Sequence, residues 1–156
     1  MYAELVRAAK KPVAKATIHS VHASSYLWND VQNLFKKSEA ARPDSSAWAQ
    51  QIDAGLCAGG VIVLAAQVYQ GRNPVTVGYS IVDVGAHEIE SMWVAPEARG
   101  FGVTDQLYGV SAVNIGTATP QAAFPHDMRD EAESLRRRLG GTLSENTAER
   151  LLVLSV

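Results

Sequence analysis

Two carboxylates and a glycine-bearing loop lie close together near the middle of the chain. Glu88 and Glu90 belong to an apolar stretch that ends at Pro96. Because alternate residues of a strand point to the same face of a sheet, we expect both carboxylates on one face. Beyond Pro96 the chain turns and enters a helical pattern, and the first amides of a helix have no partner within it. An anion-binding loop beside a candidate general base favours group transfer from a phosphorylated carrier.

The segment from Val94 to Val103, with the sequence VAPEARGFGV, resembles the signature of a known family. The GNAT superfamily of N-acetyltransferases carries V-x-P-E-x-R-G-x-G-[IV]-[GA], within which a [QR]-x-x-G-x-[GA] segment binds the pyrophosphate of acetyl-coenzyme A. Arg99 falls on the first position of that segment and Gly102 on its first glycine, whereas the last position is Thr104. Two further segments, 77–79 (VGY) and 132–140 (AESLRRRLG), resemble other parts of the family pattern.

The resemblance implies the GNAT fold, a mixed α/β architecture in one domain over residues 1–156. Its sheet is central, twisted and mostly antiparallel, with about six to seven strands flanked by about four helices. It also implies acetyl-CoA as co-substrate, bound where the fourth and fifth strands separate, and an amine as acceptor. The residues implied for cofactor binding are Met92, Trp93, Val94, Arg99, Gly100, Phe101, Gly102, Val103 and Thr104.

The family resemblance also implies roles in proton transfer. Many members use a glutamate as general base, and Glu88 falls on that position, with Glu90 one pleat nearer the cofactor. A carboxylate whose pKa is raised by burial is a competent base near neutral pH; the alternative is that one or both only keep the strand soluble. The family tyrosine that protonates the departing thiolate is replaced by Arg136, so His126 is the substitute acid. Arg129 replaces the family asparagine at the start of this helix.

Several departures from the family pattern support a second hypothesis. The β-branched Thr104 either crowds the pyrophosphate or donates its hydroxyl to it. The carboxylate of Asp105 either only satisfies the dipole at the helix start, as is ordinary there, or also competes with a phosphate. Together with Arg129 and Arg136, these residues favour a catalytically inactive GNAT-fold module for structure or interaction, with weak or no CoA binding. A longer acyl-CoA as donor is a third alternative. The acceptor, whether a small amine, a protein N-terminus or a lysine, stays open.

The residue pattern predicts the elements that position these groups. Apolar periodicity and turn residues delimit them. The expected elements are a strand over 13–20, a helix begun by Ser24 or Ser25 and ended by Lys36 and Lys37, a second helix from Ser45 or Ser46 with Trp48 and Ile52 inward, strands over 61–69, 75–84 and 87–94, a helix from Val103 closed by Gly116, a strand over 121–124, a helix through Met128 and Leu139, and a strand over 151–156.

Composition and charge exclude several classes of protein. The 156 residues are 47% hydrophobic and 19% charged, which is typical of a folded domain, and the net charge of −2 gives no reason to expect nucleic acid. The single cysteine, Cys57, excludes an internal disulfide and is expected to be buried. The histidines have no metal-ligand spacing, so no metal is expected.

The absence of a long apolar run and of a signal peptide predicts a cytoplasmic protein without membrane association. The terminal strand from Leu151 is a candidate for pairing across a two-fold axis in a homodimer.

Overall fold

The computed structural model describes residues 16–38, 45–147 and 151–156. The start of the first expected strand lies outside the described residues. The elements, in chain order, are β1 (Thr17–Ser20), α2 (Tyr26–Ser38), α3 (Ser45–Ala58), β2 (Val61–Gln70), β3 (Asn73–Asp83), β4 (Glu88–Val94), the 3₁₀ helix η1 (Pro96–Ala98), α4 (Val103–Ile115), β5 (Ala122–Pro125), the 3₁₀ helix η2 (His126–Met128), α5 (Arg129–Leu139), β6 (Thr142–Asn146) and β7 (Leu151–Ser155).

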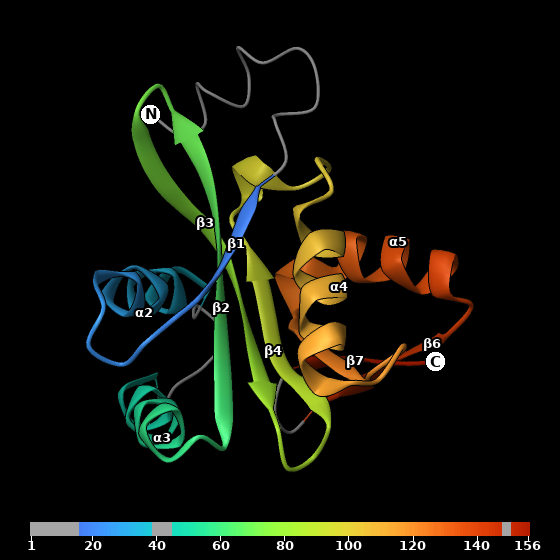
Figure 1. Ribbon diagram of the computed structural model, residues 1–156. Helices are drawn as coiled ribbons and strands as arrows, with labels where there is room; N and C mark the ends of the chain where they lie inside the picture. Colours follow the sequence, from blue (N-terminus) through green and yellow to red (C-terminus); the bar gives the residue numbers. More distant parts are fainter. Residues whose placement is uncertain (1–15, 39–44, 148–150) are drawn as a thin grey trace.

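The described strands form one seven-stranded sheet in the order β1-β2-β3-β4-β5-β7-β6. Neighbouring strands are antiparallel except for β4 and β5, which are parallel. Helices α2 and α3 cover one face of the sheet, and α4 and α5 lie on the other side (Figure 1). The predicted mixed α/β architecture with a mostly antiparallel sheet is therefore confirmed.

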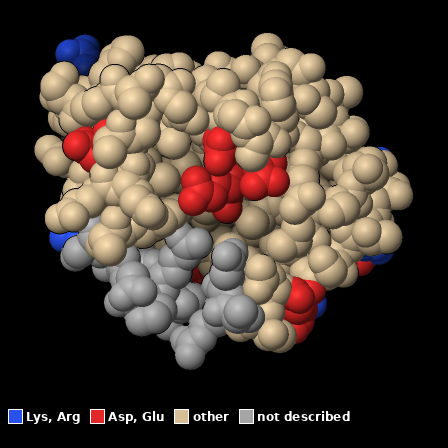
Figure 2. Space-filling model, turned by 90° about the horizontal axis from the view of Figure 1, so that it is seen from below, with Lys and Arg blue, Asp and Glu red and all other residues tan. Residues whose placement is uncertain are grey.

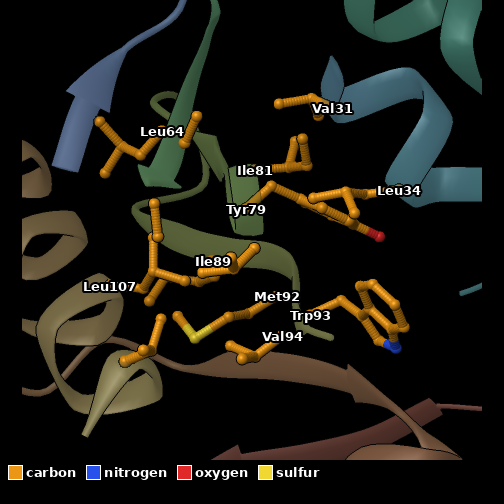
Figure 3. Close-up of a cluster of buried hydrophobic side chains, with 14 of the residues drawn as sticks. Val31, Leu34, Leu64, Tyr79, Ile81, Ile89, Met92, Trp93, Val94 and Leu107 are labelled. Atoms are coloured by element: carbon orange, nitrogen blue, oxygen red, sulfur yellow. The ribbon is translucent and has the colours of Figure 1, made fainter. Parts of the chain in front are cut away.

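The hydrophobic core lies on both faces of the central strands. Tyr79 and Ile81 of β3 point toward α2, whereas Met92 of β4 packs toward Leu107 of α4 (Figure 3). All four side chains are fully buried. Because β2 is covered on both sides, its sequence, VIVLAAQVYQ, is almost continuously apolar, as expected for a buried strand.

Strand β4 is bulged, and it separates from β5. The β3–β4 register runs from Ile81↔Ser91 to Val82↔Ile89, which leaves Glu90 as the extra residue. On its other side β4 pairs with β5 at Ile89↔Ala122, where the Ile89 amide donates to the Gln121 carbonyl at 2.8 Å. Beyond this point the two strands have no register pair among the described residues, so they diverge toward Val94.

The structure corrects several predicted boundaries. Strand β3 begins at Asn73, which pairs with Gln70, so the turn is shorter than the gap between the predicted strands over 61–69 and 75–84. Strand β6 was not predicted, because its sequence is mostly polar and its residues are exposed or only half-buried at the edge of the sheet. Cys57 is exposed near the end of α3, so its predicted burial is wrong.

Strand β7 also differs from expectation in its surroundings. It lies between β5 and β6 and is hydrogen-bonded to both. The prediction that this strand pairs across a two-fold axis is therefore wrong, because both of its edges are occupied. In the described part of the chain, no helix has the length and apolarity required to cross a membrane.

Candidate cofactor and acceptor site

The loop between η1 and α4 owes its shape to two glycines in the left-handed region. Gly100 has a φ of 85° and Gly102 a φ of 83°. A Cβ built on either residue meets no atom within 4 Å, so backbone conformation and not crowding requires glycine there. The same observation shows that the Cβ side of both glycines faces open space. Helix α4 begins immediately afterwards, at Val103.

The first turn of α4 presents backbone donors to this space. The first hydrogen bond into the helix runs from the Gln106 amide to the Gly102 carbonyl, at 3.1 Å. The amides of Val103, Thr104 and Asp105 precede it, and no described carbonyl or side chain accepts a hydrogen bond from them. A helix start with such amides favours an anionic ligand.

A carboxylate from α5 already occupies part of this array. Oε1 of Glu131 accepts from the Gly100 amide at 3.2 Å and from the Thr104 hydroxyl at 3.1 Å. These two donors and the first-turn amides of residues 103–105 are called the cradle below. Its donors hold an anionic oxygen, as a phosphate site must. Thr104 was expected either to crowd the pyrophosphate or to donate its hydroxyl to it. The hydroxyl does donate a hydrogen bond, but its acceptor is Glu131.

Arg99 connects the end of β4 to η2. Its Nε donates to the Val94 carbonyl at 2.9 Å, and its Nη1 and Nη2 donate to the carbonyl and Oδ2 of Asp127, both at 2.8 Å. Trp93 donates to the same Oδ2 at 3.0 Å, and the guanidinium lies 5.6 Å from its ring centroid. The backbone near Val94 is expected to bind the pantetheine arm, and its Val94 carbonyl is already paired within the chain.

A further ion pair joins α4 to α5. Arg138, in the last turn of α5, binds Asp105 in the first turn of α4. Asp105 is therefore neutralised by a neighbouring helix as well as favoured by the dipole of its own. Arg99, Glu131 and Arg138 together make three polar connections across the space between the loop and the η2–α5 segment.

The two candidate bases lie together on the opposite side of the sheet. Oε1 of Glu90 accepts from Nε1 of Trp48 on α3 at 3.3 Å, and the Trp48 ring stacks on Phe35 with centroids 3.8 Å apart. Glu88 pairs with Asp83 across the β3–β4 hairpin. Burial raises the pKa of Glu88, and the charges of Asp83 and Glu90 raise it further. The bulge at Glu90 thus places both carboxylates toward α2 and α3.

The surface at this end of the sheet is acidic. The β3–β4 hairpin lies at the bottom of Figure 1, and a view from below shows Asp and Glu side chains gathered near the centre, with Lys and Arg only at the rim (Figure 2). Such a surface attracts cations and disfavours anions.

Known structures have the same architecture. No family model matches the chain, and no curated protein matches it. Among solved structures, an aminoglycoside N-acetyltransferase, AAC(6')-Iy, in complex with CoA is 18% identical, with 88% of this chain and 95% of that chain covered and a TM-score of 0.60. A putative GNAT acetyltransferase from Desulfovibrio desulfuricans is 12% identical, with 88% and 96% covered and a TM-score of 0.58. The chain has the GNAT fold.

Two further neighbours with the GNAT fold act on different amines. Ribosomal-protein-alanine N-acetyltransferase from Brucella melitensis is 18% identical, with 78% of this chain and 91% of that chain covered and a TM-score of 0.55. Spermidine N-acetyltransferase from Vibrio cholerae, in complex with CoA and spermine, is 11% identical, with 90% and 92% covered and a TM-score of 0.56. At these identities the likeness establishes the fold alone.

The remaining predicted residues lie at the wide end of the β4–β5 opening or beyond it. His126 is exposed in η2, beside Asp127. Arg136 donates through Nε to Glu133 at 2.7 Å, and Arg129 forms an ion pair with Glu145. The two arginines that replace family residues are therefore occupied by partners on α5 and β6.

Sequence reasoning missed the cross-helix roles of Asp127 and Glu131. Acidic residues at a helix start suit the helix dipole, which explains their presence without any further contact. Only the packing of α5 against the loop reveals that they face Arg99 and Gly100.

Proposed function

We propose that this protein is an acetyl-CoA-dependent N-acetyltransferase that moves an acetyl group to a primary amine by direct transfer. The observation that carries the proposal is the cradle. Its amide and hydroxyl donors converge on one carboxylate oxygen, at 3.2 and 3.1 Å, beside three first-turn amides with no described acceptor. The same donors suit the oxygens of a pyrophosphate. GNAT-fold neighbours in complex with CoA support this choice of ligand.

In this proposal the loop from Arg99 to Thr104 holds the pyrophosphate, and Met92, Trp93 and Val94 form the wall along the pantetheine arm. Acetyl-CoA, when bound, supplies an acyl group activated as a thioester. The divergence of β4 and β5 provides the position for it, since β4 has no described strand partner on that side beyond Ile89.

In this proposal the acidic surface at Glu88 and Glu90 receives the amine. An amine must lose its proton before it attacks, and a base with a pKa raised toward neutrality removes that proton well. Glu88 is the better candidate of the two glutamates, since burial and two neighbouring carboxylates raise its pKa. Glu90 is held by Trp48 beside it. His126 is proposed as the acid for the departing thiolate.

A second candidate function, a catalytically inactive GNAT-fold module, is favoured by one specific observation. The first proposal assigns the loop around Gly100 to the pyrophosphate and the end of β4 to the pantetheine arm. The Gly100 amide and the Val94 carbonyl nevertheless both have partners within the chain. A protein that no longer binds CoA has no need to keep these groups available.

Isothermal titration with CoA distinguishes the two functions. We expect saturable binding with a Kd between about 1 μM and 1 mM, the range of typical substrate affinities. Gly102→Ala should weaken it at least about tenfold, because a side chain at this positive φ distorts the cradle. Gly116→Ala is the matched control, since Gly116 has a similar φ of 75° and an equally open Cβ position at the far end of α4.

The outcome of the titration decides between the candidates. Absence of heat at millimolar CoA would reject the transferase. Binding without acetylation of any amine in a panel of polyamines, aminoglycosides, lysine peptides and peptide N-termini would favour the inactive module.

A further inference from the structure

We propose that Glu131 is an internal competitor for the anion cradle and that CoA binds only after this side chain has moved away. This inference rests on the proposed function, because it describes how access to the same site is controlled. We call the contact of Glu131 with the Gly100 amide and the Thr104 hydroxyl the Glu131 latch.

The latch occupies donors that a phosphate needs. One oxygen of Glu131 accepts from both Gly100 and Thr104, so a phosphate oxygen cannot take the same position at the same time. A carboxylate left in place beside the phosphate would also repel it, because like charges at contact distance disfavour each other. Binding of the pyrophosphate therefore requires that the two hydrogen bonds to Glu131 break.

The backbone of α5 cannot easily move, so the side chain of Glu131 must. Met128 and Ala132, which flank Glu131 along the chain, are fully buried, and Leu135 is nearly so. The ion pairs of Asp127 with Arg99 and of Arg138 with Asp105 hold the helix on either side of the latch. Glu131 itself is only half-buried. Rotation of this side chain is thus the motion that opens the cradle.

Thr104 gives the latch a feature that a small residue would not provide. The hydroxyl of Thr104 is buried and donates to Glu131. With glycine or alanine at this position, the Glu131 carboxylate would lose the hydroxyl donor and keep only the hydrogen bond from the Gly100 amide. Thr104, at a position where the family pattern has a small residue, therefore helps to hold Glu131 in the latch.

The test compares CoA affinity in three variants by isothermal titration. In Glu131→Ala the competitor is absent, and we expect Kd to fall by about tenfold, the size of one charge-assisted hydrogen bond. In Glu131→Gln the contact persists without the charge, so a smaller decrease is expected. Glu133→Ala is the matched control: it removes the same charge from the same helix, but Glu133 pairs with Arg136 and does not contact the loop.

A second measurement reports the latch without any ligand. In the amide NMR spectrum of the free protein, the Gly100 signal should shift and exchange faster in Glu131→Ala than in the wild type, because its acceptor is lost. Glu133→Ala should leave this signal in place. An unchanged Gly100 signal in Glu131→Ala would overturn the latch even if the variant folds normally.

The titration separates failure of the latch from failure of the proposed function. Tighter binding by Glu131→Ala than by the wild type supports the latch. Equal or weaker binding by Glu131→Ala, with binding by the wild type, overturns the latch and leaves the transferase intact. Binding by neither protein overturns the proposed function and the latch together.

Discussion

The two sides of the sheet handle charge in opposite ways. On the side of α2 and α3, Asp83, Glu88 and Glu90 lie together, and no described Lys or Arg forms an ion pair with any of them. On the side of α4 and α5, the charged groups next to the loop are paired with cations or backbone donors of neighbouring elements. The acidic side retains an unbalanced charge, whereas the other side cancels its charges internally.

This difference indicates how each side would meet a ligand. The acidic side attracts a cation directly, because its carboxylates are close and their repulsion is relieved by a positive charge. On the other side, an anionic ligand would have to displace the Glu131 carboxylate from the cradle. Under the proposed function, a cationic amine would therefore meet a surface that is ready for it, whereas an anionic nucleotide would meet a site whose donors are already occupied.

The largest effect is expected from removing the bases on the acidic side. Under the proposed function, Glu88→Gln should lower kcat/KM by roughly 10²- to 10⁴-fold, because a general base typically contributes that much. Glu90→Gln should reduce it less, because Glu90 lies next to the base and is held by Trp48. Steady-state rates with the best amine of the panel measure both.

Asp83→Asn is the control for that experiment. It removes a charge that raises the pKa of Glu88 but leaves the candidate base in place, so the pH–rate profile should move to lower pH with little change in the maximal rate. A loss of activity in Asp83→Asn equal to that in Glu88→Gln would show that acidity of the surface, and not one base, is required.

The next largest effect concerns the paired side. Arg99→Ala removes three hydrogen bonds, including those to the Val94 carbonyl and to Asp127, and should lower the free energy of unfolding by about 2–3 kcal/mol. The side chains of Arg99 and Asp127 are 20% and 47% exposed, so water replaces the bond to the Val94 carbonyl less well than the two bonds to Asp127. Urea denaturation measures the change.

Arg129→Ala is the matched control for Arg99. The side chains of Arg129 and Glu145 are 52% and 48% exposed, and such ion pairs contribute at most about 1 kcal/mol. Equal destabilisation by the two substitutions would contradict the view that Arg99 is a structural bridge between β4 and η2.

Much of the fold could be predicted from the sequence because local rules agree with the final packing. Helix α4 ends at Ile115 with Gly116 in the left-handed region, and α5 ends with Gly140, as their glycines indicate. Strand β6 was missed because an edge strand buries little and its sequence, TLSEN, carries a weak apolar signal. Local pattern does not report hydrogen bonding to a distant strand such as β7.

The candidate site shows the same division. The glycines of the loop and the two glutamates of β4 were identified from type and spacing, and the structure places them on the two sides described above. The Glu131 contact was not identified, because Gly100 and Glu131 are 31 positions apart in the chain. Their approach depends on how α5 packs, which periodicity alone does not specify.

A smaller effect on stability is expected at Gly78, where β3 and β4 approach each other in the sheet that separates the two sides. A Cβ on Gly78 would lie 2.9 Å from the Trp93 carbonyl oxygen, so Gly78→Ala should cost about 1–3 kcal/mol of unfolding free energy. Gly109→Ala is the control, since Gly109 lies in α4 with open space at its Cβ, and alanine should stabilise the helix by up to about 1 kcal/mol. Thermal unfolding of both variants measures the contrast, and destabilisation of similar size in both would contradict it.

The smallest effect is the pH dependence of stability, and it should have opposite signs for two glutamates. Burial raises the folded-state pKa of Glu88 above its ordinary value of 4.5, so folding binds a proton there and the associated stability is lost as the pH rises above 4.5. Glu88→Gln should therefore be more stable than the wild type at pH 7, with the difference fading below pH 4.5. The hydrogen bond from Arg136 lowers the pKa of Glu133, so Glu133→Gln should be less stable at neutral pH, and that difference should also fade in acid. Urea denaturation between about pH 3.5 and pH 8 measures both. If the two differences had the same sign at pH 7, the contrast between an unbalanced acidic side and a neutralised side would not hold.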